Sequence, residues 1–149
     1  MALSGLTTEK QGRDSQVMRF DLRYLQFFDL WNHRQHFECH EVLEDLWLDT
    51  NGPQKAFYQA LIMACAAFVH LQRRNLDGAV NLLVSAHNHM EQFPPRYMAF
   101  PVREFLDLLE TWHAKVELMK AVNEVNFTPQ QLPLIEPPAG EAAARLIPV

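Results

Sequence analysis

The segment from about Gln54 to Arg74 is apolar on nearly every side of a helix, and it limits the fold more than any other part of the chain. A helix that is hydrophobic all round is buried, so this pattern predicts a central helix enclosed by others. Its alanines and Cys65 are small and allow neighbouring backbones to approach closely. The longest apolar run within it, Ala56 to Leu71, is too short at roughly 1.5 Å per residue for a bilayer core of about 30 Å. We therefore interpret it as the core of a globular domain.

Four further helices are expected around this central one, because apolar residues recur along them at the three- and four-residue spacing of an α-helix. A turn at Asn51-Gly52-Pro53 and the pair Pro94-Pro95 separate neighbouring segments. Asp77 is expected to cap the fourth helix of the chain. The four helices are expected at about Phe20–Asn32, His36–Leu48, Ala79–Gln92 and Val102–Val125. With only five glycines in 149 residues and no strand pattern, the sequence predicts an all-α, single-domain bundle of about five helices with a central apolar helix.

The composition changes at both ends of this helical region. We expect a flexible leader at residues 1–17, a helical domain at 18–125 and a proline-rich C-terminal tail at 126–149. The polar leader lacks the apolar segment of a signal peptide. The tail carries apolar side chains that offer a means of docking onto the bundle, namely Leu132, Leu134, Ile135, Leu146 and Ile147.

Charge and cysteine usage narrow the classes of partner. The formal net charge is -5, and the only basic doublet is Arg73-Arg74, so neither a nucleic acid nor a membrane surface is an expected partner. Cys39 and Cys65 show no metal-binding spacing and have apolar neighbours. Buried free thiols are typical of a reducing compartment, so the expected location is cytoplasmic.

His40 and Glu44 form the strongest candidate site. They lie four residues apart, so on a helix they share a face, together with Phe37 and Trp47. The apolar neighbours predict that both ionisable side chains look inward. An imidazole and a carboxylate at this spacing can occupy two positions on zinc or a similar divalent metal, but a zinc hydrolase needs three protein ligands and a water. The alternative is a structural pair, hydrogen-bonded within the core.

Gln59 and Trp47 belong to the same candidate site, whereas His36, Glu41 and His70 are weaker candidates. Gln59, on the central helix, is expected to orient His40 or Glu44 by a hydrogen bond. His36 lies four residues before His40 and continues the same helix face, and Glu41 lies at the border of that face. His70 is on the central helix, about 16 Å from Gln59 along the helix axis. We interpret His87, His89 and His113 as surface or edge residues. The chain has no P-loop, GxSxG, GxGxxG, HExxH or EF-hand pattern.

The run Phe37-Glu38-Cys39-His40-Glu41-Val42-Leu43-Glu44-Asp45-Leu46-Trp47 resembles the HxxxExxW signature of the family called domain of unknown function 309. The resemblance continues through Phe57–Ile62, Asn75–Ala79 and Phe93–Pro95, and covers about residues 20–120. It implies a small prokaryotic all-helical protein of unassigned function, for which metal binding has been suggested. It also implies that His40, Glu44, Trp47 and Gln59 are the signature positions. Ala60 and Met63 depart from the family pattern, and the tail is peculiar to this chain.

Two functions follow as hypotheses. The first is a divalent-metal protein with hydrolase-like chemistry, in which His40 and Glu44 are ligands and Trp47 forms a wall of the site. The second is a non-catalytic helical module for protein interaction or homo-oligomerisation, in which the histidine and the glutamate are structural. The aromatic content of 11% and the apolar tail motivate the second hypothesis.

Overall fold

Five α-helices and one short hairpin make up the part of the chain that the computed structural model describes, residues 19–138. The helices are α2 (Leu22–Asn32), α3 (His36–Leu48), α4 (Pro53–Gln72), α5 (Leu76–Met90) and α6 (Val102–Val122). The hairpin β1 (Arg96–Tyr97) and β2 (Phe100–Pro101) precedes α6, and a 3-10 turn, η1 (Pro129–Gln131), follows it. The all-α prediction is confirmed. The expected leader, residues 1–17, and the tail residues Leu146 and Ile147 lie outside the described residues.

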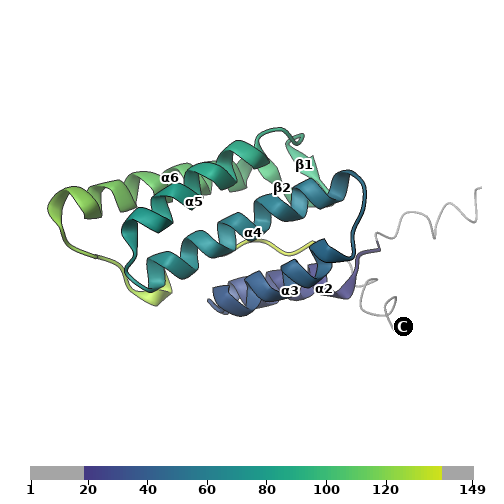
Figure 1. The fold of residues 1–149 in the computed structure, drawn as a ribbon, viewed down its shortest axis with the longest axis horizontal. Helices are drawn as coiled ribbons and strands as arrows, with labels where there is room; N and C mark the ends of the chain where they lie inside the picture. Colours follow the sequence, from purple (N-terminus) through teal and green to yellow (C-terminus); the bar gives the residue numbers. More distant parts are fainter. Residues whose placement is uncertain (1–18, 139–149) are drawn as a thin grey trace, which may run out of the picture.

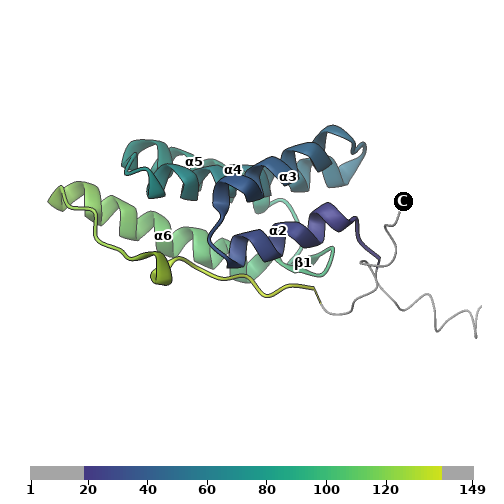
Figure 2. The same ribbon diagram turned by 90° about the horizontal axis from the view of Figure 1, so that it is seen from below.

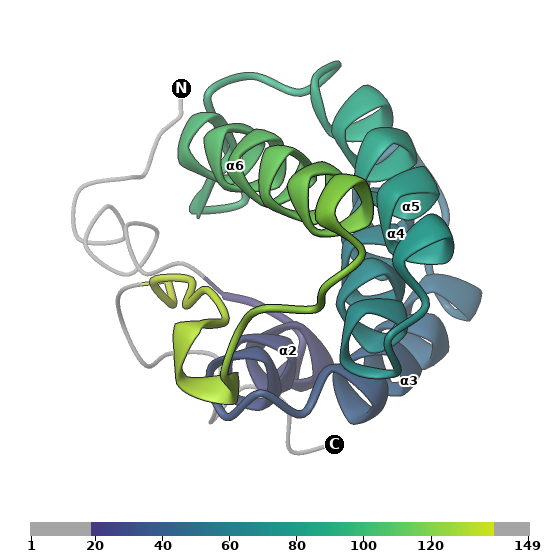
Figure 3. The same ribbon diagram turned by 90° about the vertical axis from the view of Figure 1, so that its left-hand side faces the viewer.

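The helices pack in chain order, each against the next, as an open arc. Seen end-on, α2 lies at one end of the arc and α6 at the other (Figure 3). α4 occupies the middle and packs against α3 and α5 (Figure 1). Eleven of its twenty residues are buried, which confirms the central helix that the apolar pattern predicted.

An aromatic cluster fills the inside of the arc. The Trp31 ring from α2 lies with its centroid 5.2 Å from that of Phe68 in α4 and 5.9 Å from that of Phe105 in α6. Phe68 in turn meets Trp112 of α6 edge-to-face at 5.6 Å. Such edge-to-face contacts add roughly 0.5–1.5 kcal/mol each beyond the burial of their area. The cluster therefore ties the two ends of the arc to its middle.

Three local features differ from the sequence expectations. Asn75, not Asp77, caps α5, because the Asn75 side chain accepts a hydrogen bond from the Gly78 amide at 3.1 Å. α6 ends at Val122 rather than Val125, since Asn123 adopts the left-handed conformation that stops a helix. The hairpin turns on Met98 and Ala99, both at positive φ. It has only two residue pairs, too few to give a recognisable strand pattern.

The residues after α6 form a docked strap, residues 124–138, rather than a free tail. Figures 2 and 3 show it leaving α6 and crossing to α2. Leu132 and Ile135 are buried, whereas Leu134 is 58% exposed. The Trp31 indole donates a hydrogen bond to the Pro133 carbonyl at 2.8 Å, and Asn32 exchanges two 2.8 Å hydrogen bonds with the backbone of Ile135. The strap therefore closes the arc.

Within residues 19–138, no helix is both long enough and apolar enough to cross a bilayer.

Candidate functional site

The buried face of α3 is made by His36, Cys39, Leu43 and Leu46, and not by the predicted pair. His40 lies on the flank of that face and is half-buried, while Glu44 is exposed. At roughly 100° per residue, Glu44 lies about 120° from the centre of the buried face. The prediction that both side chains look inward is therefore wrong for Glu44. It rested partly on Phe37 as a core residue, and Phe37 is 46% exposed.

Two cation–π contacts join α3 to α4 along the outer edge of their interface, which we call the α3–α4 seam. The Lys55 amine lies 4.0 Å from the centre of the Trp47 ring and donates a hydrogen bond to the Trp47 carbonyl at 3.0 Å. At the other end of α3, the Arg73 guanidinium lies 5.6 Å from the centre of the Phe37 ring. The half-buried Trp47 is thus part of this interhelical contact.

The remaining signature positions lie between these two contacts. His40 and Glu44 belong to the α3 side of the seam, and the half-buried Gln59 belongs to the α4 side. Glu41 is exposed on the opposite flank of α3, where it lines a shallow groove with residues of α2. The structure therefore separates Glu41 from the His40 side of the helix and leaves the signature pair at the surface.

His36 is the histidine of α3 that does look inward. It is 1% exposed, and neither ring nitrogen has a hydrogen-bond partner among the described residues. Its ring stacks on Phe68 at 5.3 Å and meets Trp31 edge-on at 4.7 Å. Burial lowers the pKa of His36 from 6.5 to about 4, although the nearby Gln72 side chain opposes this shift. His36 is therefore held neutral at physiological pH.

His70 has a structural role at the turn between α4 and α5. Its Nδ1 lies 2.9 Å from the Asn75 side-chain amide, and its carbonyl accepts a hydrogen bond from the Asn75 backbone at 2.8 Å. The helix cap by Asn75 is thereby fixed in place. A Cβ at Gly78 would meet the His70 ring nitrogen at 3.0 Å and the Asn75 side chain at 2.7 Å, so the turn needs glycine there.

A second histidine–acid pair, which the sequence interpretation missed, joins α5 to α6. His87 Nε2 lies 2.7 Å from a Glu110 carboxylate oxygen, and His87 Nδ1 lies 3.5 Å from Glu91. His113 lines the same hollow of about 200 Å³. Because His87 and Glu110 lie on different helices, no sequence spacing could have revealed the pair. The residues lining this hollow supply no hydroxyl or thiol nucleophile, so the pair by itself defines no reaction.

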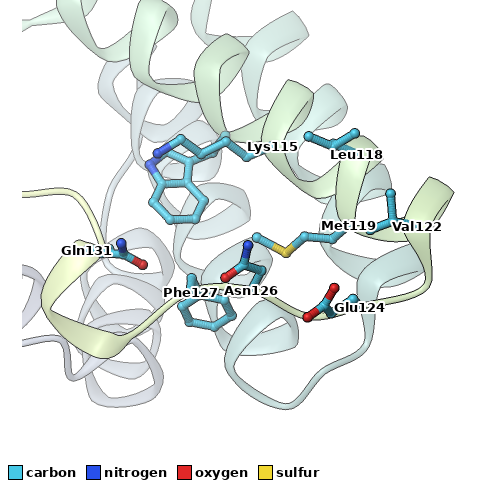
Figure 4. Close-up of a pocket in the computed structure, with 9 residues that line it drawn as sticks. Lys115, Leu118, Met119, Val122, Glu124, Asn126, Phe127 and Gln131 are labelled. Atoms are coloured by element: carbon cyan, nitrogen blue, oxygen red, sulfur yellow. The ribbon is translucent and has the colours of Figure 1, made fainter.

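A larger groove of about 420 Å³ lies between the second half of α6 and the strap (Figure 4). Its walls are apolar and include Trp112, Met119 and Phe127, with the Trp112 and Phe127 rings perpendicular at 6.3 Å. Lys115 and Glu124 add one charge of each sign, and the Lys115 amine lies 4.6 Å from the centre of the Trp112 ring. Pockets of this size and character are common binding sites in proteins.

The predicted metal ligands do not form a complete site. Among residues 19–138, no group of three or more His, Cys, Asp or Glu side chains is arranged to hold an ion. His40 and Glu44 would offer two ligands, one fewer than catalytic zinc sites use. The residues described here thus do not fit a metal held by one copy of the chain.

Comparisons with known proteins find a family that matches part of the chain. Residues 24–82 match the model of the family described as "Domain of unknown function (DUF309)". The chain is similar to the DUF309 family over this part. The matched part runs from α2 into α5 and contains every predicted site residue, including His36, His40 and His70. The second half of α5, all of α6 and the strap, and hence the large groove, lie beyond that match.

A curated relative also lacks an assigned function. The "Uncharacterized protein YpuF" of Bacillus subtilis (strain 168) is 25% identical over 100 residues, which are 62% of this chain and 55% of YpuF. The chain thus spans about half the length of that relative. No solved structure matches this chain significantly. The similarity to DUF309 therefore indicates a family but does not indicate a reaction.

Replacing Glu44 with alanine tests whether His40 and Glu44 form a structural pair or whether Glu44 is only a surface residue. Because Glu44 is exposed, the Glu44→Ala variant is expected to change the free energy of unfolding by no more than about 0.5 kcal/mol. Leu43→Ala, at the adjacent buried position, is the matched control and should cost about 2–5 kcal/mol. Urea denaturation followed by circular dichroism measures both values. A loss above about 2 kcal/mol in the free energy of unfolding of Glu44→Ala would support the hypothesis that His40 and Glu44 form a structural pair.

Proposed function

We propose that this protein is a non-catalytic helical interaction module that associates with a second copy of itself through the groove between α6 and the strap. The observation that carries this proposal is a ridge of exposed apolar side chains beside the groove. Leu118 and Val122 lie four residues apart on α6 and are 64% and 57% exposed. Both also line the groove (Figure 4).

The ridge and the groove suit one another. A residue at the tip of the ridge, such as Leu118, is apolar, and the groove walls of Trp112, Met119 and Phe127 are apolar too. Because both features lie on the same face, two copies related by a two-fold axis can each insert a ridge into the groove of the other. Such a self-complementary arrangement closes as a dimer. Contiguous apolar surface of this kind typically marks a protein interface.

The charged residues that line the groove also favour a second copy of the chain as its partner. Lys115 and Glu124 both line it and carry opposite charges. In a two-fold pair, Lys115 of one copy can lie opposite Glu124 of the second copy, and the reverse pairing occurs at the symmetric position. Complementary charges at the rim of an interface fix the register of the two partners. A partner with a single sign of charge would leave one of the two side chains unmatched.

A charge placed on the ridge tests this proposal. Leu118→Glu is expected to weaken dimer formation at least about tenfold, because the carboxylate would be buried in an apolar groove. Leu48→Glu is the matched control, since Leu48 on α3 is 65% exposed and lies far from the groove in sequence and fold. Sedimentation equilibrium gives the dissociation constants. Equal effects of the two substitutions would contradict a dimer through α6.

The rim charges provide a second variant that leaves the ridge unchanged. Lys115→Glu alone should weaken the dimer, and Lys115→Glu combined with Glu124→Lys should restore it, because the opposite charges would again face each other. A double variant as weak as the single one would show that the two residues do not pair between copies.

Divalent-metal binding with hydrolase-like chemistry is the less supported function. His40 and Glu44 offer two ligands at the surface, and the described residues supply no third. Hydrolysis at zinc also requires a bound water in a partly enclosed site, whereas Glu44 is exposed.

A further inference from the structure

The two cysteines of the chain meet inside the α3–α4 interface. Cys39 of α3 and Cys65 of α4 are both fully buried, and their Sγ atoms lie 3.2 Å apart. Cys39 Sγ also lies 3.5 Å from the Phe27 carbonyl oxygen, to which its thiol can donate. The chain has no other cysteine. Any disulfide formed within one copy must therefore join these two residues.

We propose that Cys39 and Cys65 are a redox-sensitive pair that a hydroperoxide converts into a reversible disulfide joining α3 to α4. A disulfide requires the sulfurs to approach to about 2.05 Å, so the two atoms must close by only about 1 Å. The two residues lie 26 positions apart, so the bond closes a loop through the whole α3–α4 turn. This inference is independent of the proposed dimer, which uses α6 and the strap.

The reaction takes place in two steps. The sulfur of one cysteine, as its thiolate, attacks the terminal oxygen of the hydroperoxide, the one that carries the hydrogen. The O–O bond breaks, the leaving oxygen takes up a proton, and a sulfenic acid remains. The second sulfur then attacks the sulfenic sulfur, the S–O bond breaks, and the hydroxide leaves as water after protonation. Two thiols are oxidised to one disulfide, and one hydroperoxide is reduced to an alcohol, or to water, plus water.

Burial determines how this pair would behave. It raises the pKa of Cys39, so little thiolate is present and the first step is slow. The second step is fast in comparison, because the other sulfur is already 3.2 Å away. Burial also keeps large thiols and other protein chains away from the sulfurs. Oxidation should thus lead to the internal disulfide rather than to cross-linked dimers or to higher oxidation of a single sulfur.

The bond would affect the helix that carries the DUF309 signature. Cys39 lies next to His40 in α3, so a link to Cys65 would hold this turn of α3 against α4. Closing a loop of this length restricts the unfolded chain, which raises the melting temperature. The oxidised and reduced proteins should therefore differ in thermal stability while keeping the same helical content.

The test uses the full chain in its native state, treated with hydrogen peroxide for increasing times. The protein is then unfolded in N-ethylmaleimide and its intact mass is measured. We expect a product about 2 Da lighter than the reduced chain, with neither thiol alkylated, and a return to two alkylated thiols after dithiothreitol. Its melting temperature should lie about 5 °C or more above that of the reduced protein.

Single variants show whether the proximity of the sulfurs matters. Cys39→Ala and Cys65→Ala each leave one buried thiol, which should stay largely alkylatable under the conditions that convert the native pair. If a variant does not fold, the time course of the native protein decides alone. Two thiols that remain fully alkylatable, a dominant sulfinic acid, or a disulfide between two chains would each overturn the proposal.

Discussion

Replacing His36 with phenylalanine is expected to remove a pH-dependent loss of stability worth up to about 3 kcal/mol. The pKa of His36 is about 4 in the folded chain, compared with an ordinary value of 6.5. Between these pH values the unfolded chain binds a proton that the folded chain excludes. The contribution of neutral His36 to stability is therefore complete above pH 6.5 and is progressively lost as the pH falls toward 4. Phenylalanine can keep the stacking on Phe68 without taking up a proton.

Urea denaturation at pH values from 8 to 4 measures this effect as a difference between the variant and the wild type. Carboxylates also titrate in the lower part of this range, but they do so in both proteins and cancel in the difference. His89→Phe is the control, because His89 is exposed on α5 and should leave the wild-type profile almost unchanged. If His36→Phe lost stability at the same rate as the wild type, His36 would not be the buried neutral group that its contacts imply.

Removing the strap is expected to cost a large part of the stability of the domain. A chain that ends at residue 125 lacks the burial of Leu132 and Ile135, each worth about 1.5–3 kcal/mol. It also lacks the strap carbonyl that pairs with the Trp31 indole. The expected loss of about 3–6 kcal/mol is a large fraction of the roughly 5–15 kcal/mol by which a typical domain is stable. Thermal unfolding of the shortened chain measures it.

Neighbouring residues of the strap supply a control that needs no truncation. Ile135→Ala should cost about 2–4 kcal/mol because Ile135 is buried, whereas Leu134→Ala should cost less than about 0.5 kcal/mol because Leu134 is 58% exposed. Equal effects of the two substitutions would show that the strap does not dock on α2 in solution.

The helices could be predicted because their signal is local. An apolar residue every three or four positions marks a helix before any tertiary contact is known, and the bounds of α3 were predicted to the residue. For the strap, docking through apolar side chains was expected, but the sequence did not tell which of those side chains are buried. Leu132 and Ile135 lie among prolines and have no helical or strand period, and their burial depends on the Trp31 and Asn32 side chains about a hundred residues earlier.

The candidate site was predicted less well than the helices. Periodicity alone does not fix the rotation of α3 about its axis to better than one or two residue positions. For this reason Glu44 was predicted to face inward, whereas His36 is the ionisable residue that does. The two aromatic residues used to orient the helix, Phe37 and Trp47, turned out to hold cations at the surface. The His87–Glu110 pair joins two helices and the α6 groove lies between a helix and the strap, so the residue pattern of one helix could not reveal them.

The mass of the wild-type protein in solution tests the proposed function most directly. One chain weighs 17.3 kDa. Sedimentation equilibrium over a wide range of concentrations should give a mass that approaches twice this value as the concentration rises, and that falls back to one chain for Leu118→Glu at the same concentrations. A wild-type mass of one chain throughout the range would contradict self-association through α6 and the strap.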